Sequence, residues 1–530
     1  MLEKTLKRFT SVVLNKHLLY NFVLGLSLVF AYAPFALWWL PFLIIPIWLQ
    51  QLYTTSSREV AKRSYAFSLG WFASGIGWVH VSIEQFGGMP LFASLLLMLV
   101  LCMYLAIYPA LAAYLAKRLS FGSHINLWLL PATWMILEYL RGIVLTGFPW
   151  LSFGYTQIDG PLVTLAPYIG EIGLTFVVVL LSVVIVHVVT KTHFKLALAV
   201  SILAIISFVN IPMEPQVKEN GKSTRIALVQ GNVKQELKWE PEMQWPTMLK
   251  YMDLARTNYD ADVIVWPESA IPAFEPLLST QEFLDMADRS ASLNKSAIIT
   301  GIINYQYNSD QYFNALIVLG NKEQSENVDY NESGESYYYN NSNRYYKNHL
   351  LPIGEFVPFE DWLRPVAPFF NLPNSSFSRG DYIQPNLQAN GHLFLPLICF
   401  EIAFPHQLAA NFSEDTDFLL TVSNDAWFGN SHGPHQHMEI ARMRAIEFGR
   451  PLVRATNTGV TAIVDHQGKM LNVAPQFQES VIKSDVAMVE GRTTYSLYWP
   501  WIQFGLPFFY LGLCLIITSL HYILVTKRAK

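Results

Sequence analysis

The feature that most constrains the fold is the distribution of apolar residues, which gather in long runs toward both ends of the chain. A helix that crosses a bilayer needs about 20 mostly apolar residues. The candidate runs cover roughly residues 18–33, 36–52, 65–82, 90–115, 125–146, 171–190, 195–212 and 503–525. Because the residues between the last two runs have an ordinary soluble composition, the sequence predicts a multi-span helical membrane bundle of about eight spans that carries a soluble domain.

The overall composition supports this interpretation. Charged residues make up 14% of the chain, against about 25% in a typical soluble protein. The net charge is only −4, and no basic stripe of the kind that binds nucleic acid is present. We therefore expect a protein of the lipid bilayer with no nucleic-acid partner.

The loops between the candidate spans differ in their basic residues. Lys and Arg gather in the N-terminal segment, in loops 53–64, 116–124 and 190–195, and at the C-terminus. The alternate loops, at about 33–36, 83–89 and 147–170, contain none. Since basic loops stay in the cytoplasm, eight spans would place both termini there and the soluble domain on the outer side.

Short apolar runs alternate with helical patterns from about residue 224, which is typical of an α/β domain. The expected strands are 225–229, 263–266, 297–303, 313–319, 393–398, 418–422 and 460–464, and the expected helices are 243–258, 281–293 and 434–449. The predicted organisation is a membrane domain over 1–215, a catalytic domain over 216–496, and an eighth span with its tail over 497–530.

Two segments of this domain have unusual compositions. Residues 321–343 are rich in Asn, Ser, Glu and Tyr, as expected of a solvated insertion. Residues 356–370 are aromatic and contain three prolines. This second segment is either buried in the domain or dips into the lipid, because aromatic rings favour the membrane interface.

Cys399 stands apart from the other two cysteines, because Cys102 and Cys514 lie inside apolar runs. No second cysteine of the soluble domain is available for a disulfide or a Cys-rich zinc site. A free cysteine is often only a small buried apolar side chain. Its place at the end of an expected strand also suits a nucleophile.

Polar residues that can do chemistry follow three apolar runs, and they are Glu268, Lys347 and Cys399. Ligands of α/β sheets bind outside the carboxyl ends of the strands. A carboxylate can take the proton of a thiol, and a lysine lowers the pKa of the thiol and stabilises an oxyanion. The set therefore favours acyl transfer through Cys399, although Glu268 and Lys347 could also form a plain ion pair.

Histidines leave two further alternatives open. His349, or the group His432, His435 and His437, could pair with the cysteine as in cysteine proteases. His435 and His437 could also belong to a metal site, but their spacing matches no known ligand motif. We therefore expect neither a metal nor a cofactor.

Three motifs together resemble the nitrilase superfamily: Trp-Pro-Glu-Ser at 266–269, Tyr-Lys-Asn-His at 346–349 and Ile-Cys-Phe-Glu at 398–401. With the apolar runs around them, the whole chain resembles the membrane-bound apolipoprotein N-acyltransferases of that superfamily. The resemblance implies an αββα sandwich domain. It also implies Glu268 as general base, Lys347 as oxyanion stabiliser and Cys399 as the residue that forms a thioester.

The same resemblance extends to supporting residues. It implies that Glu355 and Glu401 are supporting active-site carboxylates and that Trp239 lies near the substrate. The two carboxylates could instead act only by holding other residues, and Trp239 could be ordinary packing. Phe400 departs from the family, which often has Tyr there, so no polar role is expected of it.

The reaction that the resemblance implies moves a fatty acyl chain from a phospholipid of the bacterial inner membrane to the N-terminal amine of an S-diacylglyceryl-cysteine apolipoprotein. The first rival is a membrane-anchored amidase or nitrilase that acts on a small polar molecule. The second rival is a transporter with an outer sensing domain. That reading predicts several ionisable residues inside the spans, whereas Glu138 and Arg141 are among the very few present.

Overall fold

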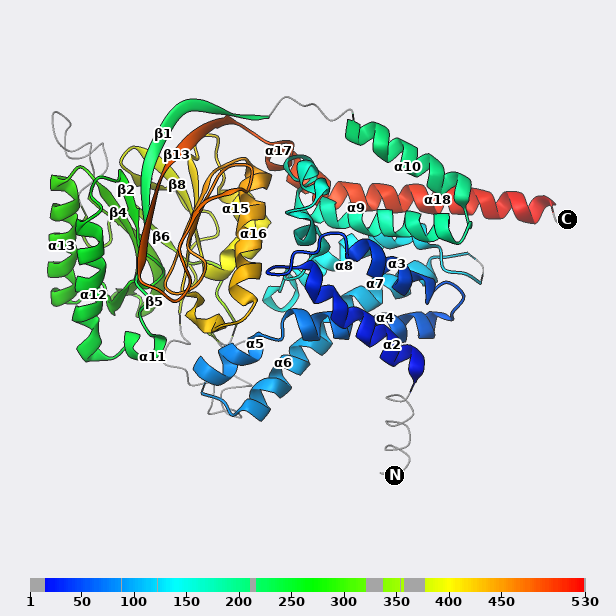
Figure 1. The fold of residues 1–530 in the computed structure, drawn as a ribbon, viewed down its shortest axis with the longest axis horizontal. Coiled ribbons are helices and arrows are strands. Elements are labelled where there is room, and N and C mark those ends of the chain that lie inside the picture. The colour runs from blue at the N-terminus through cyan, green and yellow to red at the C-terminus, as the bar shows by residue number, and fades with distance from the viewer. Residues whose placement is uncertain are drawn as a thin grey trace. The chain divides into compact units, whose positions relative to one another are not determined.

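The computed structural model describes residues 15–86, 88–121, 123–209, 216–320, 337–352, 354–356 and 377–528. The chain divides into two compact units, a helical unit (1–80, 91–215 and 494–530) and an α/β unit (81–90 and 216–493). Figure 1 colours both along the chain. The expectations for 321–343 and 356–370 fall mostly on positions 321–336 and 357–370, which lie outside the described residues.

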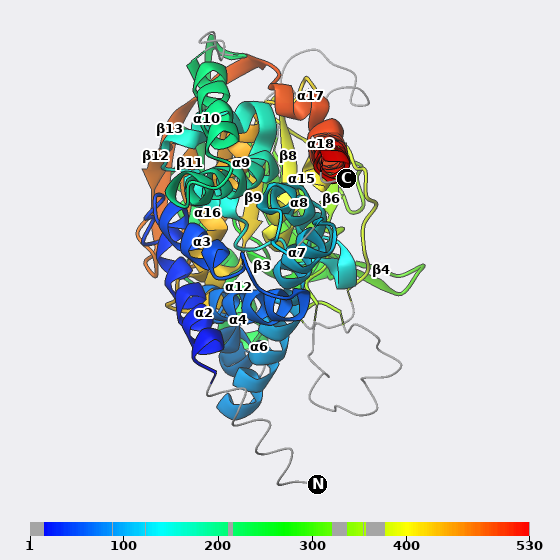
Figure 2. The same ribbon diagram turned by 90° about the vertical axis from the view of Figure 1, so that its right-hand side faces the viewer.

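Short and long helices build the helical unit (Figures 1 and 2). They are α2 (Lys16–Leu26), α3 (Pro41–Gln50), α4 (Ser57–Gly75), α6 (Leu91–Leu105), α7 (Ile107–Arg118), α8 (Leu130–Arg141), α9 (Ala166–Val189), α10 (Phe194–Val209), α17 (Thr494–Pro500) and α18 (Leu506–Arg528). Stacked aromatic rings form part of the core, with Trp71 against Phe153 at a centroid distance of 4.6 Å.

Among the described residues, three helical stretches are long and apolar enough to cross a membrane: Leu91–Arg118, Pro161–Val189 and Thr494–Leu520. A fourth is possible if Ser57–Gly75 and Val79–Gln85, which meet at 55°, count as one bent span. The chain is therefore a membrane protein with several candidate spans, but fewer than the eight expected from hydropathy meet this test.

The expected spans at 36–52 and 125–146 are shorter as helices, since α3 has 10 residues and α8 has 12. Helix α8 ends at Arg141, whose guanidinium donates to the carbonyls of Phe148 at 2.5 Å and Trp150 at 2.7 Å. These bonds fold the following segment back toward the helix. Arg141 also pairs with Glu138 and is fully buried, so it holds this turn and does not extend toward solvent.

Two β-sheets form the centre of the α/β unit. The first has the order β13-β1-β2-β4-β5-β6, with β3 beside β4, and the second has the order β12-β11-β10-β9-β8-β7. The first contains β1 (Val217–Gln230), β2 (Val263–Val265), β3 (Ile271–Phe274), β4 (Ala297–Gln306), β5 (Gln311–Leu319), β6 (Arg344–Tyr346) and β13 (Ser480–Gly491). The second contains β7 (Leu387–Ala389), β8 (His392–Ile398), β9 (Phe418–Ser423), β10 (Leu452–Thr456), β11 (Ala462–Val464) and β12 (Met470–Val473).

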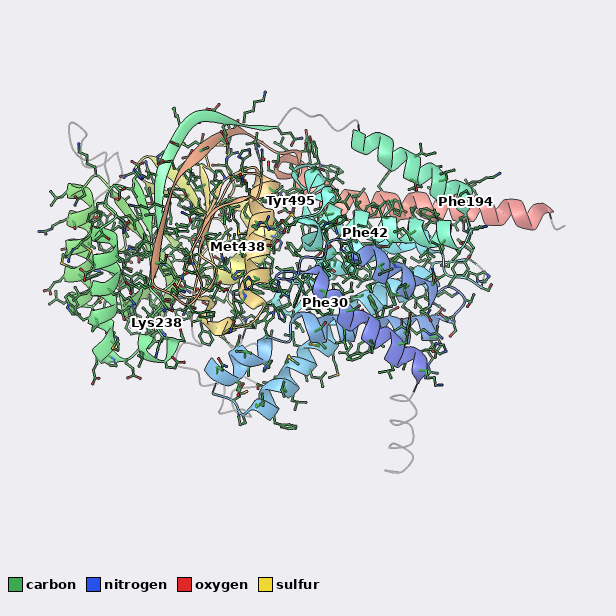
Figure 3. The ribbon with its side chains drawn as sticks, in the orientation of Figure 1. Phe30, Phe42, Phe194, Lys238, Met438 and Tyr495 are labelled. Atoms are coloured by element: carbon green, nitrogen blue, oxygen red, sulfur yellow. The ribbon has the colours of Figure 1, made fainter. Side chains whose placement is uncertain are left out.

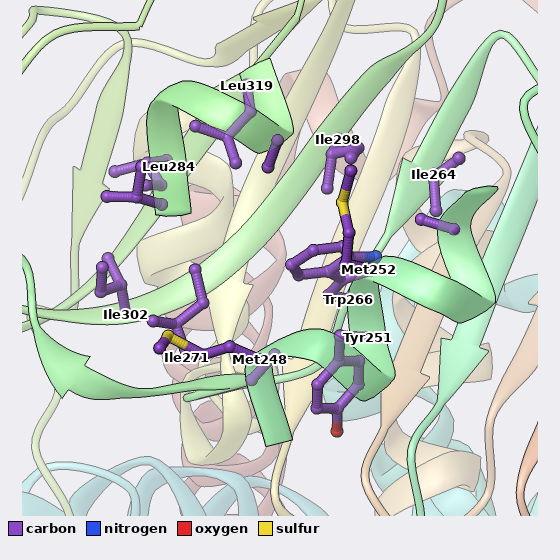
Figure 4. Close-up of a cluster of buried hydrophobic side chains, with 14 of the residues drawn as sticks. Met248, Tyr251, Met252, Ile264, Trp266, Ile271, Leu284, Ile298, Ile302 and Leu319 are labelled. Atoms are coloured by element: carbon purple, nitrogen blue, oxygen red, sulfur yellow. The ribbon is translucent and has the colours of Figure 1, made fainter. Parts of the chain in front are cut away.

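Helices cover both outer faces and give four layers. On the first sheet, α12 (Pro241–Arg256) and α13 (Leu278–Leu293) bury a cluster that includes Met252, Trp266 and Leu284 (Figure 4). A second apolar cluster, with Ile226 from one sheet and Phe418 from the other, fills the space between the sheets. Helices α15 (Pro405–Asn411) and α16 (Gly433–Phe448) lie on the side away from α12 and α13 (Figure 1). The unit therefore has the predicted αββα layering.

The direction of the strands determines where polar residues can meet. Strands β1, β2 and β4 run parallel in one sheet, and β8, β9 and β10 run parallel in the other. In such sheets, the residues that follow the carboxyl ends of the strands gather at one edge. Glu268 follows β2 and Cys399 follows β8, so each lies just beyond a strand end.

Candidate active site

A strained backbone presents Cys399 at the end of β8. Its φ angle is +54°, in the left-handed region that residues with a side chain seldom adopt. The chain then continues into a 3₁₀ turn, Cys399–Ala403. Strain of this kind persists only where the surrounding contacts impose it, and it is concentrated at functional sites. Cys399 as a whole residue is neither fully buried nor fully exposed.

The carboxylate of Glu401 ties this turn to the segment after β6. Its Oε2 accepts the Ile398 N–H at 2.8 Å, and its Oε1 accepts the N–H groups of Asn348 at 2.8 Å and His349 at 2.9 Å. The hydroxyl of Tyr345 donates to the same group at 3.0 Å. Burial raises the pKa of Glu401, although the backbone donors oppose this. Glu401 therefore holds the cysteine turn and the lysine-bearing segment in one arrangement.

An ammonium between two carboxylates forms the charged centre of the site. Lys347 Nζ lies 2.9 Å from the Glu355 carboxylate and 3.5 Å from Glu268 Oε1. Asn314 Nδ2 donates to both acids, at 2.8 Å to Glu268 and 3.0 Å to Glu355. The other oxygen of Glu268 accepts the Asn424 N–H at 2.9 Å. The Glu268 side chain is thus fixed at both oxygens.

The charges of this centre act on the thiol. Burial and, to a smaller extent, the Glu268 charge raise the pKa of Cys399 to about 12, and the Lys347 charge opposes both. Burial also disfavours the charge of Lys347, but the carboxylates of Glu355 and Glu268 outweigh burial and raise the pKa of that ammonium. At neutral pH the site therefore holds a neutral thiol beside a firmly charged lysine.

Trp239 lies directly after the short helix α11 (Gln235–Lys238) and is partly exposed. The buried Lys238, labelled in Figure 3, donates from Nζ to the backbone carbonyl of Glu268 at 3.2 Å. The same ammonium lies 5.8 Å from the centroid of the Trp239 ring. Burial lowers the pKa of Lys238 to about 8, against the attraction of Glu268. This lysine places Trp239 next to the strand end that carries Glu268.

The structure brings Glu268, Lys347 and Glu355 into direct contact, and it gives Glu401 the linking position described above. Sequence reasoning missed Asn314, which is the amide shared by the two acids. It also gave no role to Asn424, whose backbone N–H holds Glu268. Asn314 lies inside an apolar strand, and a buried amide in such a strand was the available signal.

The histidines that the sequence offered as partners of Cys399 lie in different places in the structure. His437 Nε2 lies 3.1 Å from the backbone carbonyl oxygen of Cys399, and the His349 ring stacks on Phe404 with centroids 3.7 Å apart. Within the described ranges, no group of three or more His, Cys, Asp or Glu side chains could hold a metal ion. Phe400 is 5% exposed and packs edge-on against Phe404, as expected of an apolar residue.

A base, a cation and a thiol in this arrangement can form and break an acyl thioester. The Carbon-nitrogen hydrolase family model matches residues 225–495, and the Apolipoprotein N-acyltransferase N-terminal domain model matches residues 24–184. The apolipoprotein N-acyltransferase of Shewanella oneidensis is 50% identical over 485 residues, which is 90% of this chain and 90% of that protein. The chain belongs to the apolipoprotein N-acyltransferase family.

Other members of the apolipoprotein N-acyltransferase family support the assignment. The Vibrio vulnificus protein is 46% identical over 89% of this chain and 91% of its own length. The Haemophilus influenzae protein is 40% identical over 91% and 92%. Among solved structures, the nitrilase-superfamily member Nit3 of Saccharomyces cerevisiae has 15% identity and a TM-score of 0.36, covering 54% of this chain and 96% of that one. The sequence relatives establish the family, and with it an acyltransferase of lipoprotein maturation with an active-site cysteine.

Proposed function

We propose that Cys399 takes an acyl chain from a membrane phospholipid as a thioester and passes it to the N-terminal amine of an S-diacylglyceryl-cysteine apolipoprotein. One observation carries this proposal: Lys347 bonds to Glu355 and pairs with Glu268, and the charges of Lys347 and Glu268 both act on the pKa of the Cys399 thiol. Such a centre supplies a base and a fixed positive charge to one nucleophile.

In the first step, Glu268 accepts the thiol proton as the sulfur attacks the ester carbonyl carbon of the phospholipid. The Lys347 ammonium stabilises the oxyanion that develops on the carbonyl oxygen. The bond from this carbon to the glycerol oxygen then breaks, and Glu268 returns its proton to that oxygen. A lysophospholipid leaves, and the acyl chain stays on Cys399.

In the second step, the neutral α-amine of the apolipoprotein attacks the thioester carbonyl. Glu268 accepts a proton from the nitrogen, and Lys347 again stabilises the oxyanion. The carbon–sulfur bond breaks, and the sulfur recovers a proton from Glu268. The products are an amide and the free thiol, so the kinetics are ping-pong.

The supporting residues have distinct proposed roles. Glu355 holds the Lys347 ammonium at 2.9 Å, and Glu401 positions the lysine segment and the cysteine turn. Trp239 offers an exposed aromatic face to the substrate beside Glu268.

We also propose a topology from the basic loops. The membrane domain covers 1–215, the catalytic domain 216–496 and the last span with its tail 497–530, with eight spans in all. Loops 53–64, 116–124 and 190–195 would face the cytoplasm with both termini. The catalytic domain would then face the periplasm at the bacterial inner membrane, where the bilayer presents both lipid-anchored substrates.

The test is intact-mass analysis of the full chain in detergent after incubation with a phosphatidylethanolamine of defined chains. The expected result is a mass gain of one acyl chain that maps to Cys399 and disappears when an acceptor lipopeptide is added. Cys399→Ala should give no adduct, and an adduct on that variant would refute the assignment. Hydrolysis of small amides without any acyl adduct from phospholipid would favour the alternative, a membrane-anchored amidase or nitrilase.

A further inference from the structure

A buried polar cluster lies behind the cysteine turn and has no role in the steps above. It consists of Asp425, in the turn after β9, His437 in α16, and Arg454 in β10. Each of these residues is at most 1% exposed. In Figure 3 the neighbouring Met438 marks the place of this part of α16.

The contacts of the cluster connect Asp425 and Arg454, through the His437 ring, to Cys399. Arg454 Nη2 donates to Asp425 Oδ2 at 2.8 Å and lies 2.9 Å from His437 Nδ1. The Ser423 hydroxyl donates to Asp425 Oδ1 at 2.6 Å. At the other side of the ring, His437 Nε2 lies 3.1 Å from the carbonyl oxygen of Cys399.

These partners determine which ring nitrogen carries the proton. A carbonyl oxygen can only accept, so His437 Nε2 must carry the hydrogen that meets Cys399. His437 Nδ1 is then free to accept from Arg454. The opposite tautomer would donate from Nδ1 to Asp425 Oδ1, which is 3.2 Å away, but it would set a lone pair against the Cys399 carbonyl. Burial and the Arg454 charge lower the pKa of His437 against the pull of Asp425, which agrees with a neutral ring.

We propose that Arg454 and Asp425 hold His437 as a positioning residue whose Nε2–H fixes the carbonyl of Cys399. The inference rests on the proposed role of Cys399 as nucleophile and adds a reason for its geometry. The φ of +54° is an unfavourable conformation for cysteine. A donor on the carbonyl oxygen opposes rotation of this peptide toward a relaxed conformation. The thiol therefore stays where Glu268 and Lys347 can act on it.

Two amide substitutions separate the two sides of the ring. In His437→Gln, the side-chain amide nitrogen can take the place of Nε2 and still donate to Cys399. In His437→Asn, the shorter amide takes the place of Nδ1, keeps contact with Arg454 and Asp425, and cannot reach Cys399. His392→Asn is the matched control, because His392 begins β8 and contacts Thr224 at 3.0 Å.

The rate of acyl-Cys399 formation from a defined phosphatidylethanolamine is measured on each full-length variant in detergent, beside thermal unfolding. We expect His437→Asn to lose about tenfold or more in rate, the equivalent of one hydrogen bond. We expect His437→Gln to stay within about threefold of the parent chain, and His392→Asn to match it. Equal rates for the Gln and Asn variants, whether fast or slow, would overturn the proposal.

A second measurement reads the tautomer in the unsubstituted chain and needs a folded variant only to assign the signal. Nitrogen-15 NMR of histidine-labelled protein, with the His437 signal assigned by its loss in His437→Gln, should give the neutral Nε2–H tautomer between pH 6 and pH 9. An Nδ1–H tautomer, or a charged ring in this range, would overturn the proposal. If the parent chain forms no acyl adduct at all, the proposed function is refuted, and the NMR result alone then decides the tautomer of His437.

Discussion

Separate replacement of Glu268 and Lys347 should change the reactivity of the Cys399 thiol in opposite directions. The Glu268 carboxylate raises the pKa of this thiol and the Lys347 ammonium lowers it, on top of the larger effect of burial. Glu268→Gln should therefore make the thiolate easier to form, and Lys347→Met should make it harder. Both variants should nevertheless lose acyl transfer, because one lacks the proposed base and the other lacks the proposed oxyanion stabiliser.

The size of the effect follows from the pKa. A thiol whose pKa is about 12 is ionised at pH 7.5 in roughly three molecules per 100,000. A unit charge about 5 Å away, at an effective dielectric constant near 20, changes an ionisation by about 3 kcal/mol before screening by solvent. Because Cys399 is partly exposed, we expect a smaller change, of roughly tenfold in thiolate population for each substitution.

The assay is alkylation of Cys399 by iodoacetamide between pH 7 and pH 10, with the modified site mapped by peptide mass spectrometry. The parent chain should react about tenfold faster for each added pH unit, without a plateau. Glu268→Gln should react about tenfold faster than the parent at each pH, and Lys347→Met about tenfold more slowly. Acyl-enzyme formation from phospholipid at pH 7.5 should fall at least a hundredfold in both.

Two results would refute this reasoning. A plateau of the parent chain below pH 9 would mean that the thiol ionises far more readily than its surroundings indicate. A change of alkylation rate in the same direction for both variants would mean that neither charge acts on the sulfur as described. Lys250→Met is the control, because Lys250 forms a surface ion pair with Glu479 at 2.9 Å and should leave the alkylation rate unchanged.

Substitutions at three further positions test the supporting residues. Asn314→Leu removes the amide that Glu268 and Glu355 share, so the rate of acyl-enzyme formation should fall about ten- to a hundredfold. Asn314→Asp should lower this rate further, and a rate equal to that of the parent chain in either variant would contradict the shared-donor role. Glu401→Gln sets an amide against backbone donors and should lower the free energy of unfolding by about 1.5–3 kcal/mol, which calorimetry would detect as a lower melting temperature. Trp239→Ala should raise KM for the lipid substrate more than it lowers kcat, and an unchanged KM would assign the ring to packing.

The sequence predicted the layers of the α/β unit well, because its central strands are buried on both faces and read as continuous apolar runs. Strands β4 and β8 begin at or within a residue of the predicted positions. Strands β3, β6, β7, β10, β12 and β13 were not predicted. Of these, β3, β6, β7 and β12 have only three or four residues and depend on their neighbours for pairing. Of the eight spans predicted from hydropathy, the described residues show three, or four with a bent pair, that are long and apolar enough as helices. Hydropathy measures apolar length and does not detect features such as the turn that Arg141 holds after α8.

Site residues that belong to a sequence motif could be predicted. Site residues whose role depends on tertiary contacts could not. Glu268, Lys347 and Cys399 each end an apolar run, so their chemistry is visible in the sequence. The contact of Asn314 with two acids depends on the pairing of β5 with β6, which places Lys347 beside it. His437 appeared in the sequence as a possible ligand or base, and only the structure places its Nε2 at the Cys399 carbonyl.

The high pKa of Cys399 gives the site a property that a pre-formed thiolate would lack. A thiolate reacts with oxidants and with disulfides, and the rate of these reactions increases with the exposure and the ionised fraction of the cysteine. Here the sulfur is protonated at neutral pH, and in the proposed mechanism it ionises only when Glu268 takes the proton during attack on an ester. The energetic penalty for ionisation would then be offset by Lys347, which in that mechanism stabilises the oxyanion that develops only when substrate is bound. Burial and the Glu268 charge therefore keep the thiol protonated without substrate, while Glu268 and Glu355 hold the Lys347 cation that the proposed transition state requires.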